Sequence, residues 1–76
     1  MNIEQATGMR IRELRLSMGL SQEAFSLGVD MARSYFAEIE LGKRNASMDT
    51  LARIFKGLKV TPKDFYDSPL FDDLSQ

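Results

Sequence analysis

A break of three residues between two short amphipathic segments constrains this chain more than any other feature. Ser21 is a good helix cap, and the segment that it opens turns Phe25 inward at helical spacing. The apolar pattern is lost over residues 30–32 and restarts at Phe36, in a segment that runs to Gly42. Two helices joined by so short a break cannot lie side by side as a hairpin. We therefore expect them to cross steeply, with the second helix protruding from the domain.

One longer helix is predicted before this pair. Its apolar residues recur on one face, with charged residues between them: Ile11, Leu14 and Met18. Gly19 suits a left-handed cap at the end of this helix. The start is open between Thr7 and the region of Asn2, because both residues are able to cap a helix.

Two more helices are predicted after the pair. Ser47 caps the first of them, and its inward residues are expected to be Met48, Leu51, Ile54, Phe55 and Leu58. Thr61 then caps a very short fifth helix, with Pro62 in the first turn and Asp64 three residues after the cap. The pattern thus indicates an all-α fold of five helices.

The end of the chain differs in character from the rest. Phe65 and Tyr66 are expected to close the core, and Ser68-Pro69 is expected to end regular structure. We accordingly divide the chain into a domain of residues 1–67 and a short acidic tail of residues 68–76. The sequence leaves open whether the tail is disordered or docked.

The charge of the chain is unevenly distributed. All ten Lys and Arg lie in residues 1–63 together with seven acids, whereas residues 64–76 hold four Asp and no base. The net charge of −1 therefore hides a mildly basic body, which suits a nucleic-acid partner better than the total does.

The composition also narrows the function classes. The chain has no Cys and no His, which removes thiolate metal sites and the commonest general base, so we expect no metal, no cofactor and no enzyme activity. No apolar run is long enough to span a bilayer, and no signal peptide is evident, so we expect a cytoplasmic protein without membrane contact. No small-molecule ligand is expected, because 76 residues leave no room for a ligand domain.

The central part of the chain resembles the Cro/repressor-type helix-turn-helix family, also called the xenobiotic-response-element class. The motifs that carry the resemblance are Gly19-Leu20-Ser21-Gln22-Glu23, Arg33-Ser34-Tyr35-Phe36-Ala37-Glu38-Ile39-Glu40 and Gly42-Lys43-Arg44-Asn45. The resemblance implies a five-helix, lambda-repressor-like DNA-binding domain, with the helix-turn-helix formed by its second and third helices. It also implies a transcriptional regulator that binds a two-fold operator of double-stranded DNA as a homodimer, with residues 33–41 in the major groove.

The length of the chain and one triplet of residues indicate the kind of regulator. A chain without a ligand domain suits a regulator that controls its own synthesis. Its length and the Arg33-Ser34-Tyr35 opening are similar to the controller proteins of restriction-modification systems. Phage repressors and regulators of mobile elements fit almost as well, and the sign of regulation is open.

Contacts to DNA bases are expected from the outward face of the recognition helix, at Arg33, Ser34, Ala37 and Glu38. A guanidinium is able to donate two hydrogen bonds to guanine, which makes Arg33 the main candidate; a phosphate contact or a solvated charge is the alternative. Glu38 is open between a contact to cytosine, the orientation of a neighbouring arginine and a solvated charge.

Contacts to phosphates are expected from five residues around that helix: Gln22, Tyr35, Lys43, Arg44 and Asn45. Gln22 resembles the family's phosphate-binding glutamine, and its alternative is an ordinary exposed position at a helix start. Tyr35 either donates its hydroxyl to the backbone of DNA or packs on a neighbouring helix. Such contacts position a protein on DNA without distinguishing sequences.

The resemblance further implies a structural ion pair between Arg15 and Glu40. The chain departs from the family at Asp30, which replaces a turn glycine, at Ala32, which replaces a Ser or Thr cap, and at Lys59, which replaces a glycine at the end of the fourth helix. A missing cap costs about 1 kcal/mol.

The dimer surface is expected at Phe65, Tyr66, Leu70, Phe71 and Leu74, which are too apolar for a free tail. A tail that folds back on its own core is the alternative. The rival function is a protein-binding module, such as an antitoxin that acts through this acidic and apolar tail.

Overall fold

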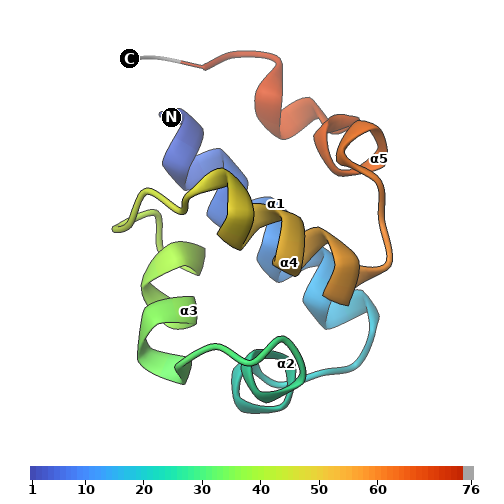
Figure 1. Cartoon of the computed structure of the whole chain (residues 1–76). Coiled ribbons are helices and arrows are strands. Elements are labelled where there is room, and N and C mark those ends of the chain that lie inside the picture. Colours follow the sequence, from blue (N-terminus) through green and yellow to red (C-terminus); the bar gives the residue numbers. More distant parts are fainter. Residues whose placement is uncertain (75–76) are drawn as a thin grey trace.

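The computed structural model describes residues 1–74, and these residues form helices throughout (Figure 1). The elements are α1 (Ile3–Ser17), α2 (Gln22–Gly28), α3 (Arg33–Glu40), α4 (Met48–Leu58), α5 (Pro62–Tyr66) and the 3-10 turn η1 (Pro69–Phe71). No strand occurs in this part of the chain, which confirms the prediction of an all-α protein. None of the helices described has the length and apolar character needed to cross a membrane.

The first helix, α1, begins at the earlier of its two predicted starts, next to Asn2. The side chain of Asn2 accepts from the N–H of Gln5 at 2.8 Å, and the Gln5 side chain accepts from the N–H of Asn2 at 3.0 Å. This reciprocal cap fixes the start at Ile3. The helix ends before Gly19, which has a φ of 74°. Met18 lies beyond the last helical residue and is 36% exposed, so its predicted place on the inward face is wrong.

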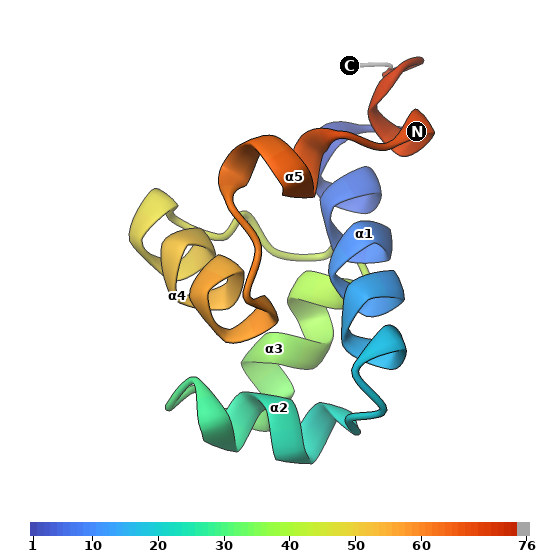
Figure 2. The ribbon, with the colours of Figure 1, turned by 90° about the vertical axis from the view of Figure 1, so that its right-hand side faces the viewer.

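The two short helices cross as the three-residue break predicts. Figure 2 shows α2 running across the base of the domain, with α3 rising steeply behind it. Ser21 caps α2 by accepting from the N–H of Ala24 at 3.0 Å. Ala32 precedes α3 and provides no side-chain cap, in line with its departure from the family pattern.

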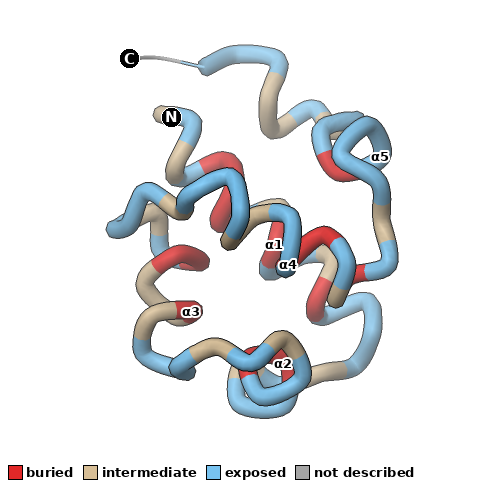
Figure 3. The backbone as a smooth tube through the Cα atoms, in the orientation of Figure 1, coloured by how far each residue is buried: buried red, intermediate tan, exposed pale blue. Residues whose placement is uncertain are grey.

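The core lies between all five α-helices, each of which contributes buried residues (Figure 3). Its largest fully buried side chains are Phe36, Phe65, Ile11, Ile39 and Ile54. The prediction for α4 holds for Ile54, Phe55 and Leu58, whereas Leu51 is only partly buried. It is wrong for Met48, which is 87% exposed because the first residue of α4 projects beyond the neighbouring helices.

Two glycines permit close helix packing. A Cβ atom at Gly8 would lie 2.3 Å from the carbonyl oxygen of Glu40, so α1 approaches the end of α3 more closely than any other residue would allow. A Cβ atom at Gly57 would lie 2.4 Å from the side chain of Val29, which brings α4 close to the end of α2. The two glycines thus bring α1 and α4 close to the two helices of the motif.

Two of the departures from the family fall on left-handed backbone. Asp30 has a φ of 56° and Lys59 a φ of 60°, conformations that L-residues other than Asn, Asp and Gly rarely adopt. Arg53 of α4 donates to the carbonyl oxygens of Val29 and Asp30, and so anchors the break between α2 and α3.

The tail is docked on the core through Phe71, as far as the structure describes it; residues 75–76 lie outside the described part. Regular structure continues past Ser68, whose side chain accepts from the N–H of Leu70 at 3.2 Å and begins η1. Phe71 packs on the core, with its ring centroid 6.0 Å from that of Phe65. The expectation that Ser68-Pro69 ends regular structure is therefore wrong. The turn η1 follows, and it packs the apolar ring of Phe71 against the core.

Candidate nucleic-acid interface

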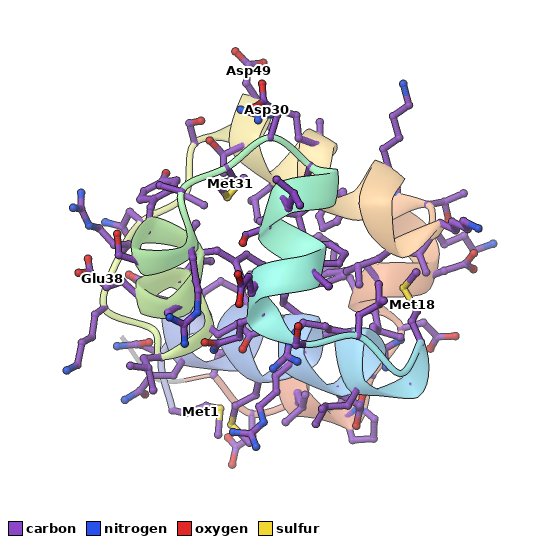
Figure 4. The ribbon with its side chains drawn as sticks, turned by 90° about the horizontal axis from the view of Figure 1, so that it is seen from below. Met1, Met18, Asp30, Met31, Glu38 and Asp49 are labelled. Atoms are coloured by element: carbon purple, nitrogen blue, oxygen red, sulfur yellow. The ribbon has the colours of Figure 1, made fainter. Side chains whose placement is uncertain are left out.

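The outward face of α3 carries the four residues predicted to contact bases. Arg33 and Ser34 are exposed, and Ala37 and Glu38 are half-buried. Figure 4 shows the Glu38 side chain on the outer side of α3, pointing away from α2. The opposite stripe of the helix is buried, with Phe36 fully enclosed and Ile39 only 2% exposed. The helix therefore presents one polar stripe to the outside, as a helix that enters a groove must.

Arg33 differs from the other arginines near the motif. Among residues 1–74, no hydrogen bond or ion pair is formed by its guanidinium. An exposed guanidinium in the first turn of a protruding helix keeps all five of its donors available.

A buried network fixes the base of the recognition helix. The guanidinium of Arg15 donates from Nε to Glu40 Oε2 at 2.7 Å and from Nη2 to Glu40 Oε1 at 3.0 Å. Its third nitrogen, Nη1, donates to the carbonyl oxygen of Leu20 at 2.7 Å. The side chains of Arg15 and Glu40 are 7% and 3% exposed. The two-point contact ties α1 both to the end of α3 and to the loop before α2.

Gln22 joins this network from the first turn of α2. Its Nε2 donates to Glu40 Oε1 at 2.9 Å. A side-chain amide has two N–H donors, so one remains for a phosphate while the other holds the amide in place. Gln22 is thus oriented by Glu40, a relationship that sequence spacing did not indicate.

Tyr35, Glu38 and Arg44 form a cluster on the surface. Arg44 Nε donates to Glu38 Oε1 at 2.7 Å, and the guanidinium carbon of Arg44 lies 5.4 Å from the centre of the Tyr35 ring. The hydrogen bond that Arg44 donates to Glu38 and the charge of that carboxylate raise the pKa of Arg44 above its ordinary value. Tyr35 therefore packs beside an arginine, and the orientation of a neighbouring arginine, one of the three alternatives for Glu38, is the arrangement present here.

The remaining residues predicted to contact phosphates lie in the loop after α3. Lys43 and Asn45 are exposed. The N–H of Lys43 donates to the carbonyl oxygen of Glu38 at 2.9 Å, which closes the end of the helix and keeps the loop beside it.

The predicted dimer surface is not one continuous face. Phe65 is fully buried in the core of its own chain, so the predicted contact of Phe65 with a partner chain is wrong. Tyr66 and Leu74 are 40% and 38% exposed, and Leu70 and Phe71 are half-buried. The expectation that Tyr66 closes the core is also wrong, because its ring lies across the outside of the aromatic cluster.

Sequence reasoning missed two arginines that hold the domain together. Arg10 donates from Nε to the carbonyl oxygen of Phe65 at 2.8 Å and from Nη2 to that of Asp64 at 2.9 Å. Arg53 holds the break before α3, as described above. Neither residue has a role predicted from the sequence, because no spacing rule relates them to carbonyl groups in distant elements.

The described residues hold no group of three or more Asp and Glu that is arranged for a metal ion. A small apolar cavity of about 120 Å³ lies beside the loop after α3, lined by residues that include Ile3, Leu51 and Tyr66. The principal polar feature of the molecule is therefore the stripe on α3 with its flanking loop. A protruding helix with this stripe, seated on a crossing partner helix, defines a helix-turn-helix protein.

The chain belongs to the helix-turn-helix family, whose model matches residues 11–65. Within that class it belongs with the control proteins. It is 42% identical over 67 residues to control protein C.BamHI of Bacillus amyloliquefaciens, covering 87% of this chain and 83% of that protein. It is 39% identical over 70 residues to control protein C.MunI of Mycoplasma sp, covering 91% and 88%.

Solved structures agree with this assignment. The restriction-modification controller protein C.AhdI of Aeromonas hydrophila superposes with a TM-score of 0.78 at 34% identity, over 82% of this chain and 94% of that chain. C.Esp1396I, solved as a tetramer with its natural 35-base-pair operator, gives 0.77 at 30% identity, over 83% of each chain. These relatives confirm the resemblance and the predicted helix-turn-helix fold, and they favour a regulator over the protein-binding module.

Proposed function

We propose that the chain is a sequence-specific DNA-binding regulator that occupies a two-fold operator as a homodimer and regulates its own synthesis. The observation that carries the proposal is the polar outward stripe of α3, with its free and exposed Arg33, on a helix fixed by the Arg15–Glu40 pair. The complex of C.Esp1396I with its operator supports DNA as the partner. This function requires no enzymatic activity and places the protein with DNA in the cytoplasm.

Base recognition is assigned to Arg33, Ser34 and Ala37. An exposed arginine in the first turn of a recognition helix reaches the O6 and N7 atoms of guanine, and a small residue one turn later lets the helix approach the groove. Structures of C.Esp1396I include variants changed at a consecutive arginine, threonine and tyrosine. Arg33-Ser34-Tyr35 is the one triplet of that type in this chain, which supports the assignment.

Phosphate contacts are assigned to Gln22, Lys43 and Asn45, with the Tyr35 hydroxyl as a further donor. Gln22 keeps one N–H free at the start of α2, where the helix dipole favours an anion. Lys43 and Asn45 are exposed on the loop beside the recognition helix. These contacts hold the domain on the duplex whatever its sequence.

Dimerisation is assigned to four residues near the end of the chain: Tyr66, Leu70, Phe71 and Leu74. The DNA-binding domain then includes η1. A single module makes few phosphate contacts, so two copies on a two-fold site are needed for useful affinity. The tetramer of C.Esp1396I supports assembly beyond one chain.

The proposal is tested by titrating the chain against duplex DNA at several salt concentrations. Each neutralised phosphate contributes about 0.9 to the slope of log affinity against log salt, so several contacts give a steep slope. A slope of zero would exclude DNA as the partner. A footprint on the DNA upstream of its own gene tests self-regulation, and sedimentation of a Leu70→Asp variant tests the dimer surface.

A further inference from the structure

We propose that Glu38 determines DNA specificity by acting through Arg44: its carboxylate holds the Arg44 guanidinium and prevents it from serving as a sequence-independent phosphate anchor. This inference rests on the proposed function and adds to it a positioning residue that is not itself assigned to a base. It also replaces the expectation that Arg44 is an ordinary phosphate contact.

The geometry restrains Arg44 from two sides. Glu38 Oε1 accepts from its Nε at 2.7 Å, and the Tyr35 ring lies 5.4 Å from its guanidinium carbon. The two other basic side chains at the recognition helix, Arg33 and Lys43, have no such partner among residues 1–74. Arg44 is therefore the basic side chain of this surface whose charge is already paired in the absence of DNA.

The Glu38–Arg44 pair penalises every duplex equally, but only a duplex that fits can offset this cost. A phosphate that approaches Arg44 must compete with the Glu38 carboxylate and is repelled by it, and this cost is the same under every sequence. The Nη1 and Nη2 groups of Arg44 form no hydrogen bond with the described residues, and they remain free to donate to acceptors that the held geometry matches. The pair thus lowers affinity for random DNA more than for a duplex that fits, which is a gain in specificity.

Because the Glu38–Arg44 pair is half-exposed, either residue can be mutated without loss of the fold. The side chains of Glu38 and Arg44 are 45% and 55% exposed, and neither belongs to the buried Arg15–Glu40 network. Exposed ion pairs contribute little to stability. We therefore expect Glu38→Gln to melt like the parent.

The test uses two duplexes: one that the parent chain selects from a randomised pool, and a scrambled duplex of the same length and composition. In Glu38→Gln the freed Arg44 should neutralise one more phosphate. Affinity for the scrambled duplex should rise several-fold, its salt slope should steepen by about 0.9, and the affinity ratio between the duplexes should fall several-fold. Glu23→Gln is the matched control, because Glu23 is an exposed carboxylate of α2 outside the ion pairs formed by residues 1–74.

A double-mutant cycle shows whether the effect passes through Arg44. In an Arg44→Ala background, Glu38→Gln should no longer change the affinity ratio. If Glu38→Gln and Glu23→Gln behave alike, or if the effect persists without Arg44, the inference is overturned and Glu38 acts by net charge or contacts a base directly. If the parent selects no duplex and shows no salt slope, the proposed function itself fails.

Discussion

Arg15 in the last turn of the chain's first helix and Glu40 at the end of its recognition helix form a two-point ion pair, with N···O distances of 2.7 and 3.0 Å. Both side chains are buried, and Gln22 adds a third helix to the contact through Glu40. The orientation of the recognition helix therefore depends on one carboxylate.

The first prediction concerns that carboxylate. Glu40→Ala should lower the free energy of unfolding by about 3–5 kcal/mol, because it leaves the Arg15 guanidinium buried without a counter-charge. Denaturant titration measures the loss, and Glu38→Ala, which removes an exposed carboxylate of the same helix, is the control. A Glu40→Ala variant that unfolds like the parent but fails to bind DNA would show that Glu40 belongs to the DNA site.

The second prediction concerns the contact of α1 with α3. Gly8→Ala should destabilise the domain by about 1–3 kcal/mol, because the added Cβ would meet the carbonyl oxygen of Glu40 at 2.3 Å. Gly28→Ala is the matched control: nothing lies within 4 Å of its added Cβ, and it should stabilise by about 0.4–1 kcal/mol. Equal melting temperatures for the two variants would contradict the close approach of the helices.

The third prediction concerns the left-handed residue after α4. Lys59→Gly should raise stability by about 1 kcal/mol, because glycine adopts a φ of 60° without the steric cost that lysine bears. Lys56→Gly, in the last turn of α4, should instead lower stability, by about 1 kcal/mol at most. Thermal unfolding of both variants checks the sign, and destabilisation by Lys59→Gly would show that the lysine side chain is needed.

The fourth prediction separates base recognition from phosphate binding. Arg33→Ala should weaken the selected duplex by about 1–3 kcal/mol and leave scrambled DNA almost unchanged, because the lost bonds go to a base edge. Lys43→Ala should weaken both duplexes equally and reduce the salt slope by about one. Competition titrations at two salt concentrations measure both effects. Parallel losses in Arg33→Ala would make Arg33 a phosphate contact.

The fifth prediction concerns the alkaline limit of stability. Burial raises the pKa of Tyr66 above its ordinary value of 10.0, because the phenolate is disfavoured where the ring is packed. The unfolded chain then ionises first, so the contribution of Tyr66 to stability is complete below pH 10.0 and is lost as the pH rises through the folded pKa. Tyr66→Phe should weaken this pH dependence in denaturation curves. Absorbance titration of Tyr35→Phe, which leaves one tyrosine, checks the pKa directly, and titration at the ordinary value would contradict it.

The sequence by itself determined the helices and the break between them. Ser21, Ser47 and Thr61 cap their helices as predicted, each through a hydrogen bond to a backbone N–H three residues ahead. Such contacts are local, and so is the helical spacing that turns Phe36 and Ile39 inward. Local rules therefore sufficed for the fold and for the outward stripe of α3.

Only the tertiary structure decided the partners of three other charged side chains, those of Arg10, Arg53 and Glu38. Arg10 and Arg53 donate to carbonyl groups of elements distant in the sequence, and Glu38 holds an arginine that lies in the following loop. It also buried Phe65 completely and left Met48 exposed, although both are apolar residues at helical spacing. These outcomes depend on which helix faces which, a relationship set by the summed packing of all helices, which no short stretch of sequence contains.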